Sequence, residues 1–276
     1  MKYKVGSELV YTINQPSTFI FNVQVVRNEF QKIIAEELHL DPQLPFDELT
    51  VDESGNRYIR LVAPQGKLTV NYQATVDLSH FFTDGKTISE VPPAKLPMET
   101  FKYLYPSRYC QSDMLFGLVQ SEFNDLPPGY SRVAGICDWI YDKVTYLSGS
   151  SDSQTSAYDT AMQRAGVCRD FAHLGVGFCR ALNIPARFVS VYAYQLDPQD
   201  FHAVFEAYLG DRWYLFDATK LAPKEGFIRV GTGRDAADVS VATIFGSVNL
   251  EEMNISVDQI SEEKADTNTG DAIAIA

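Results

Sequence analysis

The hydrophobic pattern of this chain changes its period near residue 90, and this change strongly limits the folds open to it. Before it, short runs rich in Val, Ile, Tyr, Phe and Thr are separated by turn signals such as ESGN and APQG, which is typical of β-strands. After it, apolar residues recur every three or four positions, as on the buried face of an α-helix. The order of the two patterns predicts an all-β module followed by a helical region.

A proline-rich segment, EVPPAKLPMET at residues 90–100, joins these regions. Its three prolines cannot donate backbone hydrogen bonds and favour extended chain, so we expect a domain boundary there. The predicted organisation is an N-terminal β-sandwich over residues 1–95 and a second domain over residues 96–250. Residues 251–276 hold seven acidic groups and one lysine and include the polar stretch EKADTNTGD, which predicts an acidic, disordered tail.

The charge and hydropathy of the chain exclude some classes of partner. At a net charge of −13 it lacks the excess of Lys and Arg that phosphate binding requires, so we expect no nucleic acid partner. No run of eighteen apolar residues occurs, so we expect no membrane partner either. The start MKYKVGSELVYTI has neither the apolar segment nor the cleavage site of a signal peptide, which predicts a cytoplasmic protein.

Four cysteines stand at irregular spacings and without a CxxC pair, at Cys110, Cys137, Cys168 and Cys179. This arrangement matches neither a disulfide framework nor a zinc-binding pattern, so we expect four free thiols and no metal or other cofactor. Cys110, Cys137 and Cys179 are expected to pack in the core.

Cys168 has a different setting, in the stretch AGVCRDFAHLGVG at residues 165–177. Gly166 lets the chain turn, and Cys168 then begins a predicted helix whose apolar stripe is formed by Phe171, Leu174, Phe178 and Leu182. Free N–H groups and the positive dipole end of the first helical turn favour a thiolate and could bind an oxyanion. Cys168 is therefore a candidate nucleophile, while Arg169 and Asp170 are expected to form local ion pairs or caps.

A thiolate needs a base, and the chain has four histidines. His39 and His80 belong to the β module. His173 lies about 140° around the helix axis from Cys168, so its ring is expected to point elsewhere and to pack against the neighbouring sheet. His202 is the better candidate, because it opens HAVFEAYLGDRWYLFDAT, a pattern typical of a β-hairpin.

The register of this hairpin brings a carboxylate near His202. If the turn is centred on Gly210 and Asp211, paired residues have numbers that sum to 421, so His202 faces Thr219 and Asp217 is its diagonal neighbour. Diagonal neighbours on one face lie about 5.5 to 8 Å apart, within reach of a carboxylate that holds an imidazole. Spacing alone does not decide whether His202 and Asp217 form a functional site or are surface residues without a functional role. Glu206, on the same strand face, is left unassigned.

Three blocks of the chain resemble the core of the transglutaminase-like superfamily, in the bacterial branch described as cysteine proteases. They are GVCRDFAHL, CRALNIPARFVSVY and FHAVFEAYLGDRWYLFDAT. The resemblance covers about residues 100–245, and the β module ahead of it is similar to the N-terminal domain of these proteins. It implies an α+β fold with a papain-like core, in which helices pack on an antiparallel sheet. It also implies that Cys168 is the nucleophile, His202 the base and Asp217 the orienting acid.

The implied function is a thiol-dependent amide-bond hydrolase or acyl transferase that acts on a peptide or another amide through a thioester. The sequence does not decide among peptidase, amidase and transamidase. Trp139 and Tyr146 are candidates for a second oxyanion donor.

Two other classes of function are weighed beside this one. The first is a metal site formed by Cys168, Asp170, His173 or His202, which their spacing disfavours. The second is a catalytically silent binding or scaffold protein with the same fold.

Overall fold

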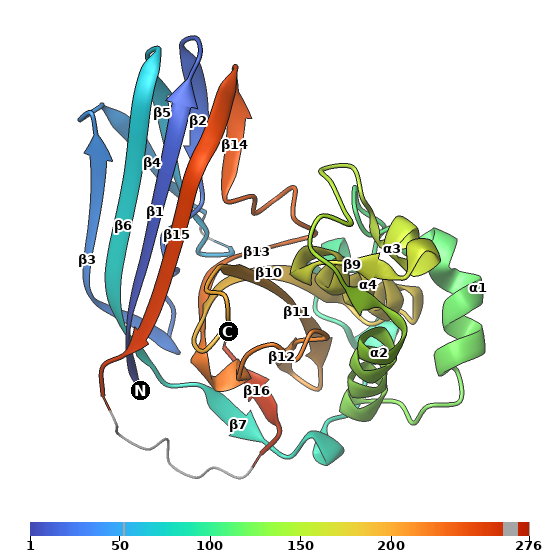
Figure 1. Ribbon diagram of the computed structural model, residues 1–276. Coiled ribbons are helices and arrows are strands. Elements are labelled where there is room, and N and C mark those ends of the chain that lie inside the picture. Colours follow the sequence, from blue (N-terminus) through green and yellow to red (C-terminus); the bar gives the residue numbers. More distant parts are fainter. Residues whose placement is uncertain (52, 262–269, 276) are drawn as a thin grey trace.

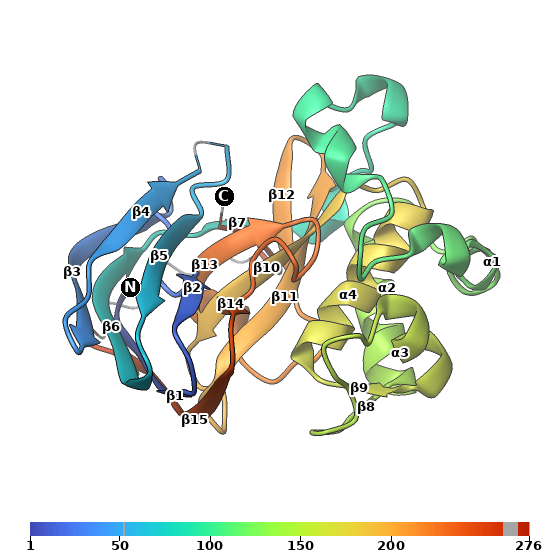
Figure 2. The same cartoon turned by 90° about the horizontal axis from the view of Figure 1, so that it is seen from above.

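The computed structural model describes residues 1–51, 53–261 and 270–275 (Figure 1). A β-sandwich stands beside a second unit in which helices cover a sheet, and Figure 2 shows the two units from above. In these residues no helix is long and apolar enough to cross a membrane.

The β-sandwich consists, in the described residues, of two antiparallel four-stranded sheets. The first has the order β15 (Val248–Gln259), β1 (Lys2–Ile13), β6 (Gly66–Leu78) and β3 (Gln31–Asp41). The second has the order β14 (Ala242–Phe245), β2 (Ser17–Phe21), β5 (Arg57–Ala63) and β4 (Phe46–Thr50). Alternate residues of β6 are buried, because one face of the strand packs on the core between the sheets.

The predicted limits of the sandwich are wrong, because two of its strands come from the end of the chain. β15 pairs with β1 from Tyr3 opposite Gln259 to Ile13 opposite Val248. Its acidic residues are exposed, whereas Ile255 and Val257 are buried against the sandwich. An acidic composition is compatible with a strand when one of its faces remains in water.

The prediction of a disordered tail over residues 251–276 is also wrong, because β16 (Ala272–Ala274) pairs with β7 (Phe81–Thr83). Ala272 to Ile275 are buried, since this apolar stretch packs on the sheet of the second unit. Residues 262–269 of the predicted tail lie outside the described residues.

The second unit contains an antiparallel sheet of the order β12 (Arg212–Phe216), β11 (Phe201–Leu209), β10 (Ala186–Ala193) and β13 (Phe227–Gly233). Its helices are α1 (Ser112–Phe123), α2 (Tyr130–Lys143), α3 (Ala157–Gln163) and α4 (Cys168–Ala181). Shorter elements are β8 (Thr145–Tyr146), β9 (Ala165–Gly166), and the 3₁₀-helices η1 (Gly85–Thr87), η2 (Pro93–Lys95), η3 (Met98–Tyr103) and η4 (Lys224–Gly226).

Helix α4 lies between this sheet and the other helices and is almost wholly buried (Figure 1). A Cβ atom at Gly175 would lie 2.4 Å from the ring of Phe205 on β11, so glycine is required for the helix to approach the sheet this closely. The absence of a side chain at Gly175 thereby sets how near the middle of α4 can come to β11.

A buried apolar cluster joins the two units. Tyr192, Ile228 and Val230 from the sheet of the second unit belong to the same buried cluster as the interior of the sandwich. The Tyr192 hydroxyl donates a hydrogen bond of 2.8 Å to the carbonyl of Val23.

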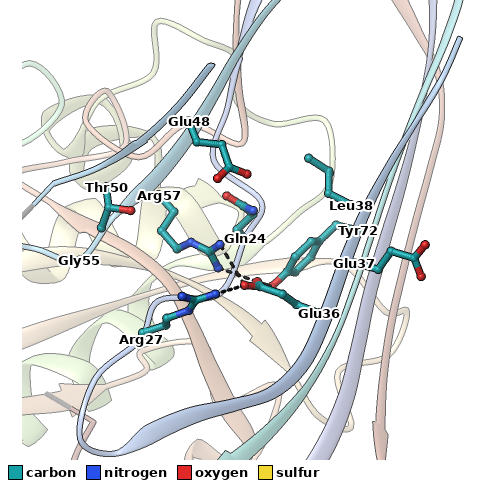
Figure 3. Close-up of a pocket in the computed structure, with 10 residues that line it drawn as sticks. All are labelled: Gln24, Arg27, Glu36, Glu37, Leu38, Glu48, Thr50, Gly55, Arg57 and Tyr72. Carbon is teal, nitrogen blue, oxygen red and sulfur yellow. Dashed lines mark hydrogen bonds and ion pairs between the residues drawn. The ribbon is translucent and has the colours of Figure 1, made fainter. Parts of the chain in front are cut away.

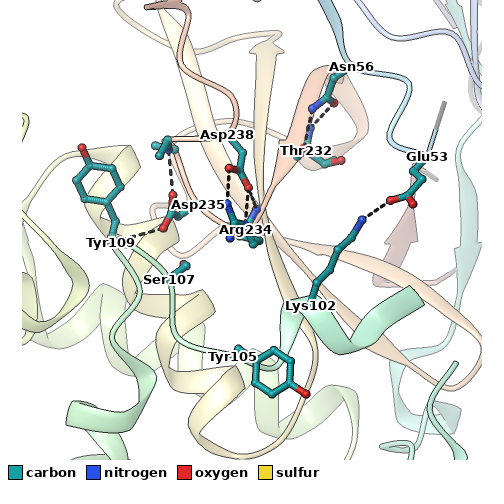
Figure 4. A network of polar contacts seen from close by, with 12 residues as sticks. Glu53, Asn56, Lys102, Tyr105, Ser107, Tyr109, Thr232, Arg234, Asp235 and Asp238 are labelled. Carbon is teal, nitrogen blue, oxygen red and sulfur yellow. Dashed lines mark hydrogen bonds and ion pairs between the residues drawn. The ribbon is translucent and has the colours of Figure 1, made fainter. Parts of the chain in front are cut away.

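Polar contacts join the units elsewhere (Figure 4). Asn56 exchanges two hydrogen bonds, of 2.8 and 2.9 Å, with the backbone of Thr232, and Lys102 forms an ion pair with Glu53.

Candidate active site

Cys168 is the first residue of α4, as predicted, and its side chain is partly exposed. The preceding backbone is held by Asp170, whose Oδ2 accepts a hydrogen bond of 2.9 Å from the N–H of Val167. Arg169 pairs with Oδ1 of the same carboxylate at 2.9 Å, so the expected ion pair and cap are both confirmed. A Cβ atom at Gly166 would lie 2.7 Å from Cβ of Asp170, so glycine is needed here for this close approach rather than for a turn.

The predicted hairpin register is confirmed. Phe205 stands opposite Phe216 and Leu209 opposite Arg212, so the paired numbers sum to 421. β12 ends at Phe216, and Asp217 therefore follows the strand instead of continuing the ladder.

His202 and Asp217 nevertheless come together in the interior. His202 Nε2 lies 3.1 Å from Asp217 Oδ2 and 3.4 Å from Thr219 Oγ1. The other carboxylate oxygen, Oδ1, accepts hydrogen bonds of 2.8 Å from both the backbone N–H and the hydroxyl of Thr219. The carboxylate is thus held in one orientation, and the imidazole with it. Thr219, which was expected only to face His202, also holds the Asp217 carboxylate in place.

Asp217 and Cys168 both affect the pKa of His202. Burial by itself lowers the pKa of His202, but hydrogen bonds with Asp217 and Cys168, together with their charges, raise it to about 10. Since Nε2 faces Asp217, Nδ1 is the ring nitrogen that remains for Cys168. Nδ1 is buried and forms no hydrogen bond within the described part of the chain.

Two family models and several known proteins match this chain. Residues 1–99 match the family model described as "Bacterial transglutaminase, N-terminal domain", and residues 119–218 match the one described as "Transglutaminase-like superfamily". A crystal structure named "a Putative Cysteine Protease from Cytophaga hutchinsonii" is 44% identical in sequence, with a TM-score of 0.92 over 99% of this chain and 96% of that one. The chain belongs to the transglutaminase-like superfamily. The predicted α+β fold, with its N-terminal β-sandwich and papain-like core, is confirmed.

Relatives of this transglutaminase-like protein also occur in mycobacteria. An uncharacterized protein of Mycobacterium leprae is 32% identical over 193 residues, which are 65% of this chain and 68% of that protein. An uncharacterized protein of Mycobacterium tuberculosis is 27% identical over 264 residues, or 84% of this chain and 83% of that protein.

The remaining cysteines of the transglutaminase-like core are enclosed in the interior. Cys110, Cys137 and Cys179 are buried, as expected, and burial raises the pKa of each thiol. Cys168 is thus the cysteine that combines partial exposure with a neighbouring imidazole.

His173 packs against the neighbouring sheet, as expected. Its ring stacks on Tyr109 and contacts Phe188 of β10, and its Nε2 accepts a hydrogen bond of 3.1 Å from the N–H of Ala236. Burial lowers the pKa of His173 to about 3, so the ring is neutral at pH 7. Since His173 bonds Ala236 and Asp170 pairs with Arg169, the structure does not gather the four residues of the metal alternative into one site.

Tyr146 and Trp139, the two candidate donors, lie in different surroundings. Trp139 donates its indole N–H to Glu122 at 2.8 Å, and its ring packs within the helical layer. The ring of Tyr146 instead packs on Phe171, one turn beyond Cys168 on α4. Burial and the charge of Cys168 raise the pKa of Tyr146 to about 12. Tyr146 therefore lies beside the thiol.

Glu206, left unassigned above, lies on the same strand as His202 and is fully buried between two arginines. Arg187 donates to it at 2.6 Å from β10, and Arg229 pairs with it from β13. This ion pair network crosses three strands and contacts none of Cys168, His202 and Asp217. Glu206 therefore orders the sheet.

Proposed function

We propose that this protein is a thiol-dependent amide hydrolase or acyl transferase with Cys168, His202 and Asp217 as its catalytic triad. The observation that carries the proposal is the placement of the His202 imidazole, whose Nε2 is held 3.1 Å from Asp217 while Nδ1 is left for the thiol that begins α4. The 44% identity to a chain named a cysteine protease supports the same class of chemistry.

The tautomer of His202 follows from its partners. With a proton on Nε2 directed at the Asp217 carboxylate, the neutral ring has a free electron pair on Nδ1. Nδ1 takes the Cys168 proton, and Asp217 stabilises the resulting imidazolium. This accounts for the upward shift of the His202 pKa.

The reaction then proceeds through a thioester. The Cys168 thiolate attacks the amide carbonyl, the C–N bond breaks, and the imidazolium gives its proton to the leaving amine. Water or a second amine attacks the thioester, His202 takes a proton from that nucleophile, and the thiolate leaves. Water gives an acid as product, whereas an amine gives a new amide.

The oxyanion of each tetrahedral intermediate needs donors near the sulfur. We propose the backbone N–H of Cys168, in the free first turn of α4, and the hydroxyl of Tyr146. The positive end of the helix dipole acts in the same direction.

A covalent trap tests the proposal. The full chain is incubated with a peptide library, with and without an added primary amine, quenched in acid, and analysed by intact-mass spectrometry. Wild-type protein is expected to gain acyl groups on Cys168, Cys168→Ala none, and the matched control Cys110→Ala the same as wild type. Acylation that survives in Cys168→Ala, or a folded wild-type protein that no peptide acylates, would refute the proposal.

The substrate, the cytoplasmic location and the lack of a nucleic acid or membrane partner stay predictions.

A further inference from the structure

The β-sandwich contains a polar cavity of about 400 Å³ that is lined entirely by residues of the sandwich. It opens where the edge strands β3 and β4 meet, and Figure 3 shows its lining. Charged and amide groups line this cavity, and it is open to solvent, because Arg27, Glu37, Glu48 and Thr50 of its lining are exposed. Its volume lies in the range of small-molecule sites, about 300 to 1,000 Å³.

One wall of the cavity carries a net positive charge. Arg57 donates two hydrogen bonds, of 2.7 and 3.1 Å, to the two oxygens of Glu36, and Arg27 pairs with the same carboxylate (Figure 3). Burial disfavours the charged carboxylate, but hydrogen bonds and charge from Arg57, with smaller contributions from Arg27 and Tyr72, hold the pKa of Glu36 below its usual value. Glu37 also lines the cavity, but Figure 3 shows its carboxylate directed away from both arginines, so the two guanidinium groups face only one carboxylate on this wall.

The opposite wall carries a negative charge. Glu48 stands on the edge strand β4, is exposed, and forms no ion pair with any residue in the described ranges. Figure 3 shows its carboxylate directed toward Gln24 and Arg57. A carboxylate and a guanidinium pair thus face the cavity from two sides.

Gln24 lies between these two walls, and only 4% of its surface is exposed. Its carboxamide points into the cavity (Figure 3) and makes no hydrogen bond to another described residue. The polar atoms of this carboxamide remain accessible to solvent, so a ligand that supplies a donor or an acceptor at this position would replace water there.

We propose that this cavity binds a small zwitterion, namely an amino acid or a short peptide. Its carboxylate lies against Arg27 and Arg57, its ammonium group against Glu48, and an intervening polar group at the Gln24 amide. A simple anion would leave Glu48 unpaired, and a simple cation would leave the guanidinium charge unpaired. The inference does not depend on the triad, because none of the lining residues belongs to it.

The experiment uses a series of probes with increasing distance between ammonium and carboxylate: glycine, β-alanine, glycylglycine and triglycine. Binding to the full chain is measured by ligand-detected NMR up to about 20 mM. One member of the series is expected to bind saturably, whereas its N-acetylated form and its C-terminal amide, which each lack one charge, bind at least tenfold more weakly.

Variants locate the site. Glu48→Gln, at an exposed position where folding is not at risk, should weaken binding of that probe about fivefold or more, and Gln24→Leu should do likewise. The matched control is Glu29→Gln, which removes an exposed carboxylate outside the lining. The proposal is overturned if no zwitterion binds saturably, if the blocked forms bind equally well, or if Glu48→Gln behaves like Glu29→Gln. No turnover is measured, so failure here would leave the proposed chemistry of Cys168 untouched.

Discussion

His202 Nε2 and Asp217 Oδ2 lie 3.1 Å apart although fifteen positions separate the two residues. The hairpin of β11 and β12 brings them to the same end of the sheet, and the chain leaves β12 at Phe216, so that the Asp217 carboxylate turns toward the ring. This contact directs Nδ1 to the start of α4.

Cys168 should react with iodoacetamide near pH 6.5 at least about tenfold faster than any other cysteine, because it is partly exposed and borders an imidazolium. Peptide mass spectrometry after limited alkylation measures the four rates. Burial of the other thiols could produce the same ranking, so His202→Ala is the control, and its Cys168 should react more slowly than that of the wild type. Equal labelling of Cys168 and Cys179 would contradict the nucleophile assignment.

Asp217→Asn should leave the protein folded and reduce turnover about 10³ to 10⁴-fold, as in the serine triad. The amide can still accept from Thr219 through Oδ1, but its NH₂ then faces Nε2 and favours the tautomer with the proton on Nδ1. That tautomer cannot accept the Cys168 proton. The same exchange at Asp211, exposed in the hairpin turn, is the control and should not change turnover. Unchanged turnover and thiol reactivity in folded Asp217→Asn would remove Asp217 from the triad.

The stability that the His202 imidazolium contributes should depend on pH in a defined direction. Its pKa is raised from 6.5 to about 10 in the folded protein, so the contribution is complete below pH 6.5 and is lost as the pH rises toward 10. Asp217→Asn should thus cost on the order of 1 to 3 kcal/mol at pH 6 and clearly less at pH 9.5. Urea unfolding of both proteins at the two pH values measures the difference. His173 is present in both proteins, so its titration does not contribute to the difference between them. A difference that stays constant or grows with pH would contradict the assigned charge.

Tyr146→Phe should lower turnover about tenfold or more, since removing a single oxyanion donor costs up to 10² to 10³ in other enzymes. The phenylalanine ring keeps the packing on Phe171, so the thermal midpoint should change little. The alkylation rate of Cys168 separates the roles, because a donor to the oxyanion is not needed for attack on iodoacetamide. An equal loss of alkylation and turnover would indicate that Tyr146 acts on the thiol itself.

A chain that starts at residue 96 should fail to unfold cooperatively, contrary to the expectation of two separately built units. The truncation removes the partner of β15 and exposes Tyr192, Ile228 and Val230, which are buried with the sandwich. Fully burying a large apolar side chain contributes about 1.5 to 3 kcal/mol, so these three residues alone amount to much of a typical domain stability. Circular dichroism during urea unfolding measures cooperativity. A sharp transition like that of the full chain would show an independent core.

The local parts of the site could be predicted from the sequence. Cys168 begins a helix because a periodic apolar stripe starts there, and His202 meets Asp217 because a short hairpin has few possible registers. Both signals lie within about 20 residues of chain. They depend on periodicity and turn chemistry, which act between near neighbours.

The long-range pairings were decided only by the tertiary structure. The start of α4 reaches His202 because α4 packs closely on β11, with Gly175 against Phe205, and no local pattern specifies that contact. β15 pairs with β1, more than 200 residues away in the sequence. The acidic composition of this segment predicted disorder, although the segment forms a strand with one buried face. β16 is ordered because its alanines and isoleucines fill an apolar surface of the sheet. Composition shows how polar a segment is. Whether the segment is buried depends on a distant apolar surface on which it can pack, and that surface forms only when the rest of the chain folds.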